Sequence, residues 1–127
     1  PTIGREQSGI RPALILSVKE FNNSMASKVI ALPLTSKNKE IPLDVELLPP
    51  DGGINKVSYI KIEYLRSLSK NRLIEKWGTI SLSKLIEVES KVKLFLGFWN
   101  NFNQISGIKA LVEKLDIVEV ERYFIIN

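Results

Sequence analysis

The chain has 127 residues, 44% of them hydrophobic, which fits one globular domain, and no apolar run approaches the roughly 18 residues of a membrane helix. Cysteine and histidine are absent, which excludes disulfides and removes the usual ligands of zinc, so neither a metal nor a cofactor is expected. The net charge of +4 is uneven, because residues 1–98 hold 15 Lys and Arg against 10 Asp and Glu, and this basic excess favours a polyanionic partner such as RNA.

A polar loop opens the chain. Residues 1–10 carry an arginine, a glutamate and a glutamine between two glycines, and residues 11–17 follow as a predicted buried strand. Pro12 near the start of that strand implies an edge or an entry position. Residues 18–27 are polar and Asn-rich, which predicts a loop or a single helical turn. Because loops on a rigid scaffold often carry functional residues, the first loop is a candidate for the site.

Short strands separated by turns are predicted from residue 28 to residue 80. Residues 28–34 are apolar and rich in β-formers, and residues 43–47 alternate with period two, as a half-exposed strand does. Pro49–Gly53 has strong turn chemistry. The predicted strands are residues 28–34, 43–47, 57–62 and 76–80. Many short strands with turns between them indicate a small barrel rather than a parallel sheet.

A helix is predicted to begin at Ser81 or Ser83, either of which is a plausible N-cap. Apolar residues then recur at steps of three and four and form one stripe, as expected for a helix packed on the barrel. The stripe consists of Leu85, Val88, Val92, Phe95, Leu96 and Trp99. After an Asn-rich break at residues 100–104 come a short helical pattern (Ile108, Leu111, Val112, Leu115) and a predicted strand at residues 117–127.

Four segments of the chain carry a resemblance to one protein family. They are residues 1–16, 32–37, 57–67 and 70–73. In sequence and in order they closely resemble the MazF/PemK (Kid-like) toxins, ribonucleases of bacterial toxin–antitoxin modules. The resemblance covers residues 1–98 and implies a mainly β fold with helices: a small SH3-like antiparallel barrel of the MazF/PemK/CcdB type, with a C-terminal helix packed on it.

The chain is accordingly divided into a toxin barrel with its packed helix, residues 1–98, and an extension, residues 99–127. Family members carry a strand immediately before the Pro-Thr-x-Gly turn, and here that turn is at residues 1–4. Residues 117–127 are therefore either the relocated first strand or an unrelated appendage. We predict that this segment pairs beside residues 11–17 and brings Asn127 close to Pro1, within the chain or by exchange from a neighbour.

The resemblance implies a sequence-selective endoribonuclease (mRNA interferase). The chain starts without a signal-type apolar segment, so a cytoplasmic protein is the default expectation. Cleaving RNA without a metal requires a base for the 2′-hydroxyl, an acid for the leaving group, and donors for the phosphorane. The expected products from single-stranded RNA carry 2′,3′-cyclic phosphate and 5′-hydroxyl ends. The expected partners are RNA in a groove across a homodimer, and a cognate acidic antitoxin whose partly disordered tail occupies that groove. No membrane is expected.

Four residues are the catalytic candidates. Arg11 matches the arginine that contacts the scissile phosphate in the family, and Thr35 matches a hydroxyl donor to that phosphate. Lys61 and Glu63 match the general acid and base of the Kid branch, with Lys in place of Arg. Being two apart on one predicted strand, Lys61 and Glu63 should share a face. Outside the resemblance, Arg11 could be a solvated charge, Thr35 a turn residue, and the Lys–Glu pair a surface ion pair.

Five further residues are candidates for RNA binding. Glu6 and Gln7 match loop residues that shape the site and touch bases, and Arg5 stands where other members have histidine or serine. Ser36 pairs with Thr35 in the family's Thr-Ser motif, and Lys37 follows it. The positions of Arg66 and Arg72 look structural in the family, at dimer contacts or under the barrel.

Two other functions remain open on the sequence. CcdB shares this fold but poisons DNA gyrase without being an enzyme, and fold alone does not separate the two activities. The Glu-Gln-x-Gly-x-Arg-Pro loop and the Thr35-Ser36 pair favour the ribonuclease. An inactive RNA-binding member of the fold is the third possibility, because Arg5 and Lys61 both depart from the best-known members.

Overall fold

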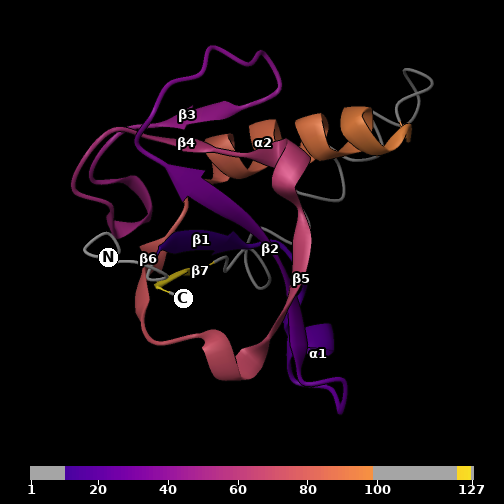
Figure 1. The fold of residues 1–127 in the computed structure, drawn as a ribbon. Helices are drawn as coiled ribbons and strands as arrows, with labels where there is room; N and C mark the ends of the chain where they lie inside the picture. The colour runs from indigo at the N-terminus through magenta and orange to yellow at the C-terminus, as the bar shows by residue number, and fades with distance from the viewer. Residues whose placement is uncertain (1–10, 99–122, 127) are drawn as a thin grey trace, which may run out of the picture.

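The computed structural model describes residues 11–98 and 123–126 (Figure 1). The elements are β1 (Pro12–Ile15), α1 (Lys19–Asn22), β2 (Lys28–Thr35), β3 (Val45–Leu47), η1 (Asp51–Gly53), β4 (Ser58–Ile60), η2 (Ile62–Tyr64), β5 (Arg66–Ser69), η3 (Lys70–Arg72), β6 (Lys76–Thr79), α2 (Leu82–Leu96) and β7 (Tyr123–Ile126). The first loop with Arg5, Glu6 and Gln7, the Asn-rich break and the short helix predicted around residues 108–115 lie outside the described residues.

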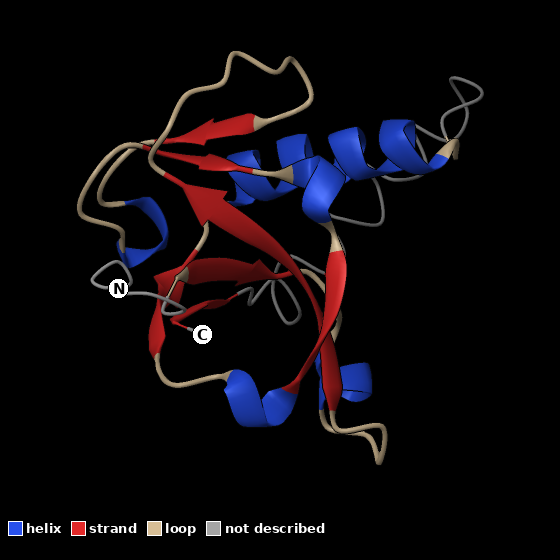
Figure 2. Ribbon diagram, viewed as in Figure 1, coloured by secondary structure: helices blue, strands red, loops and turns tan. Residues whose placement is uncertain are grey.

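In the described residues, seven strands form one antiparallel sheet in the order β3-β4-β2-β1-β7-β6, with β5 also paired to β2. The long strand β2 organises it, because it pairs with β1, with β5 through residues 28–31 and with β4 through Leu34 and Thr35. Figure 2 shows the curl of these strands beside α2. The structure thus confirms two parts of the predicted fold: the antiparallel sheet and the helix packed on it.

The C-terminal strand lies inside the sheet. β7 pairs with β1, where Pro12 faces Ile126, and on its other edge with β6, where Lys76 faces Ile125. The prediction that the tail pairs beside residues 11–17 is therefore confirmed for residues 123–126. The remainder of residues 117–127, including the expected approach of Asn127 to Pro1, lies outside the described residues.

The core occupies both faces of the central strands. Period-two alternation sends Leu14 and Leu32 into the larger cluster, which lies under α2, and sends Ala13 and Ile15 into a smaller cluster on the opposite face. The remaining members of the larger cluster are Leu34, Val45, Leu47, Ile54, Ile60, Ile62, Ile80, Leu85 and Val88. β1 and β2 are buried on both sides and give the site a rigid base.

Helix α2 follows the predicted stripe over its first half. Leu85 and Val88 are buried and Val92 packs against the core, whereas Phe95 and Leu96 are exposed among the described residues. Ser81 is the N-cap residue but does not cap with its own side chain. Instead, the carboxylate of Asp51 accepts hydrogen bonds from Ser81 N and Ser81 Oγ, both at 2.7 Å, which ties the helix start to η1. No helix in the described part of the chain is long and apolar enough to cross a bilayer.

Two local predictions were wrong. The strand predicted for residues 57–62 ends at Ile60, and the chain then turns through the 3₁₀ helix η2. β5 was not predicted as a strand, because Arg66-Ser67-Leu68-Ser69 contains no β-branched or aromatic residue and buries only Leu68. It forms because its backbone pairs with the first half of β2. Residues 18–27 were expected to form a loop or a single helical turn, and the structure has the helical turn α1 there.

Candidate active site: a cationic groove beside β2 and η2

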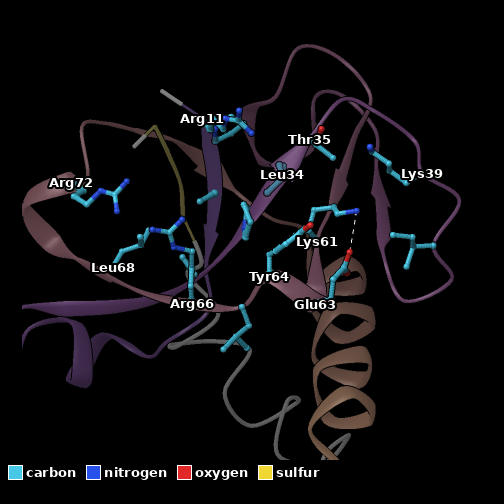
Figure 3. Close-up of a pocket in the computed structure, with 16 residues that line it drawn as sticks. Arg11, Leu34, Thr35, Lys39, Lys61, Glu63, Tyr64, Arg66, Leu68 and Arg72 are labelled. Carbon is cyan, nitrogen blue, oxygen red and sulfur yellow. Dashed lines mark ion pairs between the residues drawn. The ribbon is translucent and has the colours of Figure 1, made fainter. Parts of the chain in front are cut away.

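An open groove of about 790 Å³ runs across β1, β2, η2 and β5. Its floor is apolar and includes Ala13, Ala31 and Leu34. Among the described residues, its charged lining consists of Arg11, Lys39, Lys61, Glu63, Arg66 and Arg72, five cations against one carboxylate (Figure 3). A concave surface with this balance attracts a polyanion. The exposed side chains of Arg66 and Arg72 also line this groove. The sequence had suggested structural positions for them, at dimer contacts or under the barrel.

Arg11 and Thr35 both line this groove. Arg11 directly precedes β1, and Thr35 is the last residue of β2. In the antiparallel pair of β1 and β2, Ala13 lies opposite Pro33. Arg11 and Thr35 therefore lie at the same end of the two strands. Arg11 is exposed, so its guanidinium can meet a phosphate bidentately. Thr35 Oγ1 accepts a hydrogen bond from Lys37 N at 3.2 Å, so it also shapes the turn, while its hydroxyl hydrogen can still donate.

Ser36 and Lys37 are exposed and do not line the groove. They follow Thr35 in the turn that leaves β2. The structure therefore brings Thr35 to the groove and leaves its two neighbours beside it. Their predicted contacts with RNA stay predictions.

Lys61 and Glu63 meet at the groove, although not as neighbours on one strand. Lys61 follows the end of β4 and Glu63 lies in η2, and the turn brings Lys61 Nζ to 3.1 Å from Glu63 Oε2 (Figure 3). The Lys61 ammonium also lies 5.7 Å from the centre of the Tyr64 ring, within reach of a cation–π contact. The prediction that the two side chains share one strand face was wrong. The pair is not a surface ion pair either, because the Lys61 side chain is only 7% exposed.

Asp44 completes the cluster and was missed in the sequence. Its Oδ2 accepts a hydrogen bond from Lys61 Nζ at 2.8 Å, and its side chain is 6% exposed. The alternation of residues 43–47 suggested that Asp44 and Glu46 face solvent together. Glu46 does, but a turn in which Asp44 N donates to Ile41 O at 2.9 Å precedes β3 and holds Asp44 against Lys61. No local signal in the sequence indicates this contact.

The three groups shift one another's protonation. Burial raises the pKa of Asp44, and the neighbouring Glu63 carboxyl raises it further against the opposing effect of Lys61. Burial also raises the pKa of Glu63, but its interactions with Asp44, the backbone and Lys61 outweigh burial, so that pKa falls below its usual value. The hydrogen bond to Asp44 raises the pKa of Lys61 despite burial. The lowered pKa of Glu63 favours its ionised form, and the raised pKa of Lys61 favours its protonated form.

Comparisons with known proteins find relatives of this chain. A profile of the family described as PemK-like, MazF-like toxin of type II toxin–antitoxin system matches residues 1–96. The chain is 36% identical over 104 residues to Endoribonuclease MazF of Staphylococcus epidermidis, covering 81% of this chain and 86% of the relative. It is 37% identical over 99 residues to Endoribonuclease MazF of Staphylococcus saprophyticus subsp. saprophyticus, covering 76% and 82%.

A solved structure also resembles the fold. The crystal structure of MazE–MazF (Form-II) from Deinococcus radiodurans superposes with a TM-score of 0.62 at 34% sequence identity, covering 78% of this chain and 86% of that chain.

Proposed function

The chain belongs to the PemK-like, MazF-like toxin family of type II toxin–antitoxin systems, and from this premise we propose that it is a metal-independent endoribonuclease. Its substrate is single-stranded RNA, cut in a sequence-selective way to leave 2′,3′-cyclic phosphate and 5′-hydroxyl ends. The observation that supports this best is the groove in which an exposed Arg11 and the hydroxyl of Thr35 accompany an ionised, partly exposed Glu63. The curled sheet of this family member is proposed to close as the barrel expected from the resemblance.

The proposed reaction is an internal transfer at phosphorus. Glu63 takes the proton of the 2′-hydroxyl, the 2′-oxygen attacks the phosphorus, and the bond from phosphorus to the 5′-oxygen breaks. Arg11 and Thr35 donate to the non-bridging oxygens, whose charge grows in the transition state. The 5′-oxygen leaves with a proton supplied by water, which the open groove admits.

Lys61 takes a different part from the one expected of it. Its ammonium donates to Asp44 and lies in an ion pair with Glu63, and its pKa is raised, so it is a poor proton donor to a leaving group. We assign Lys61 the role of a fixed charge that holds Glu63 at the groove in ionised form.

The test is cleavage of a long single-stranded RNA by the purified protein in EDTA, with both ends analysed. Cleavage to 2′,3′-cyclic phosphate and 5′-hydroxyl ends is expected, because the neighbouring 2′-oxygen serves as nucleophile and the chain has no histidine or cysteine to hold a catalytic zinc. Activity that needs added magnesium, or a 5′-phosphate on the downstream fragment, would refute this chemistry. Arg11→Ala serves as the inactive control.

The proposed assembly is a homodimer inhibited by an acidic antitoxin. The MazE–MazF structure from Deinococcus radiodurans and the excess of cations in the groove both support such a partner. We expect an antitoxin tail to fold onto the groove and compete with RNA, as disordered acidic segments do on basic surfaces. Measuring RNA affinity with and without the antitoxin tests this, and an unchanged affinity in the complex would locate the antitoxin elsewhere.

A further inference from the structure

Asp44 has no part in the reaction steps given above, yet it is built into the same cluster. Its carboxylate is almost fully buried and does not line the groove, so it cannot touch RNA. Its Oδ2 accepts the 2.8 Å hydrogen bond from Lys61, and the same ammonium lies 3.1 Å from Glu63 Oε2. One buried cation thus bridges two carboxyl groups from distant parts of the sequence.

The other oxygen of each carboxyl is left without a donor. Asp44 Oδ1 and Glu63 Oε1 are both buried and have no hydrogen-bond partner. Buried polar atoms are nearly always satisfied in folded proteins, so two orphaned acceptors in one cluster require an explanation. A proton carried by one carboxyl and donated to the other satisfies both oxygens at once, as in other paired carboxylates.

We propose that Asp44 is a positioning residue of the ribonuclease site, which shares one proton with Glu63 and, through Lys61, holds Glu63 at the groove as the base. The inference rests on the proposed function, because Glu63 is the base only in that reaction. Asp44 is the natural carrier of the shared proton, since its side chain is 6% exposed and that of Glu63 is 25% exposed. Burial disfavours the charged form most at the more buried group.

The shifts in proton affinity agree with this placement. The pKa of Asp44 is raised, by burial first and then by the neighbouring Glu63 carboxyl, and the pKa of Glu63 is lowered. Two interacting carboxyls titrate as a pair, so the ionisations belong to the cluster rather than to either residue alone. Two consequences follow: Glu63 ionises early as the pH rises, and a second proton leaves the pair above the usual range of an aspartate.

The charged surroundings of the pair are few among the described residues. Lys61 and the Tyr64 ring come from the turn after β4, and Lys39 lines the groove from the loop before β3. From α2, which packs against β3 and η2, Lys91 Nζ donates to the carbonyl of Pro42 at 2.5 Å. Lys61 is the cation that contacts both carboxyls, so it sets the charge that they share.

This arrangement predicts a particular pH dependence of turnover. While Asp44 holds the proton, it donates to Glu63 and weakens that base; once Asp44 ionises, the donation ends and the base strengthens. The value of kcat should therefore rise in two steps. Asp44→Asn keeps an amide donor at the same place but cannot ionise, so it should lose the upper step. Above that step we expect kcat to fall about tenfold, less than the roughly 10²–10⁴-fold effect of losing a base, with KM unchanged.

The experiment follows the carboxyl carbon of Glu63 by ¹³C NMR through a pH titration, in the wild-type protein and in Asp44→Asn, alongside kcat and KM for a short RNA substrate. The matched control is Glu46→Gln, which removes the same charge from the exposed side of β3. We expect two steps for Glu63 in the wild type and in Glu46→Gln, and one step in Asp44→Asn.

A single-step titration of Glu63 in the wild type, which requires no variant to fold, would overturn the proton sharing. An Asp44→Asn profile of kcat with the wild-type shape would leave Asp44 a structural residue only. If the wild type cleaves no RNA although Glu63 titrates in two steps, the proposed function fails and the role of Asp44 in it fails with it. If RNA is cleaved but the coupling is absent, the present inference fails alone.

Discussion

Replacing Lys61 by methionine isolates the ammonium that bridges the two carboxyls. Methionine keeps a similar unbranched volume, so the change removes charge rather than packing. The ammonium lies 2.8 Å from Asp44 Oδ2 and 3.1 Å from Glu63 Oε2, and the Lys61 side chain is 7% exposed. Removing one partner of a buried ion pair typically costs about 3–5 kcal/mol, because the remaining charge stays buried. We expect Lys61→Met to lower the free energy of unfolding by about that much at pH 7.

The loss should shrink in acid. In the variant, burial without a cation holds both carboxyl pKa values above their unfolded values, so the stability they contribute is present at low pH and lost as the pH rises. In the wild type, the raised pKa of Asp44 acts in the same direction as in the variant, but the lowered pKa of Glu63 contributes stability at neutral pH that is lost as the pH falls. Both effects make the difference largest near neutrality, and smaller as the pH falls through about 6 to 4.

Urea unfolding at pH 7 and pH 4.5 measures this difference. Lys84→Met is the matched control, because Lys84 pairs with Glu87 at 3.2 Å with side chains 32% and 42% exposed. An exposed pair of this kind contributes at most about 1 kcal/mol. A loss in Lys61→Met no larger than in Lys84→Met, or one that does not diminish in acid, would refute the reasoning.

Arg11→Ala should lower kcat/KM by roughly 2–4 kcal/mol of transition-state stabilisation with an unchanged Tm, and activity within a few-fold of wild type would remove Arg11 from the mechanism. Thr35→Val should act in the same direction but less strongly, and a larger loss than in Arg11→Ala would contradict the roles assigned. Gly78→Ala should destabilise the fold by about 1–3 kcal/mol, because its Cβ would lie 2.8 Å from the Gly52 carbonyl carbon; a wild-type Tm would exclude this close backbone contact. Deleting residues 117–127 should cause aggregation, because β1 and β6 lose their shared partner β7, and a soluble, fully active dimer would show the strand to be dispensable.

The local pattern of apolar and polar residues was sufficient to predict much of the scaffold. The apolar run at residues 28–34, the alternation at residues 43–47 and the helical stripe from Leu85 are statements about neighbours a few residues apart. The structure has β2, β3 and α2 at those places. The motifs around Arg11 and Thr35 identified the family, and β1 and β2 then place both residues at one groove.

Tertiary structure decided what depends on residues far apart in the chain. β5 exists because β2 offers it a backbone partner, and β7 pairs with β1 across more than a hundred residues. Asp44 looked solvent-facing, but the turn before β3 buries it against Lys61, and Lys61 in turn pairs with Glu63. A sequence pattern records the period of side chains along one element, whereas burial and charge pairing arise only when separate elements meet. The fold could therefore be expected from the chain alone, while the protonation of its site required the packed molecule.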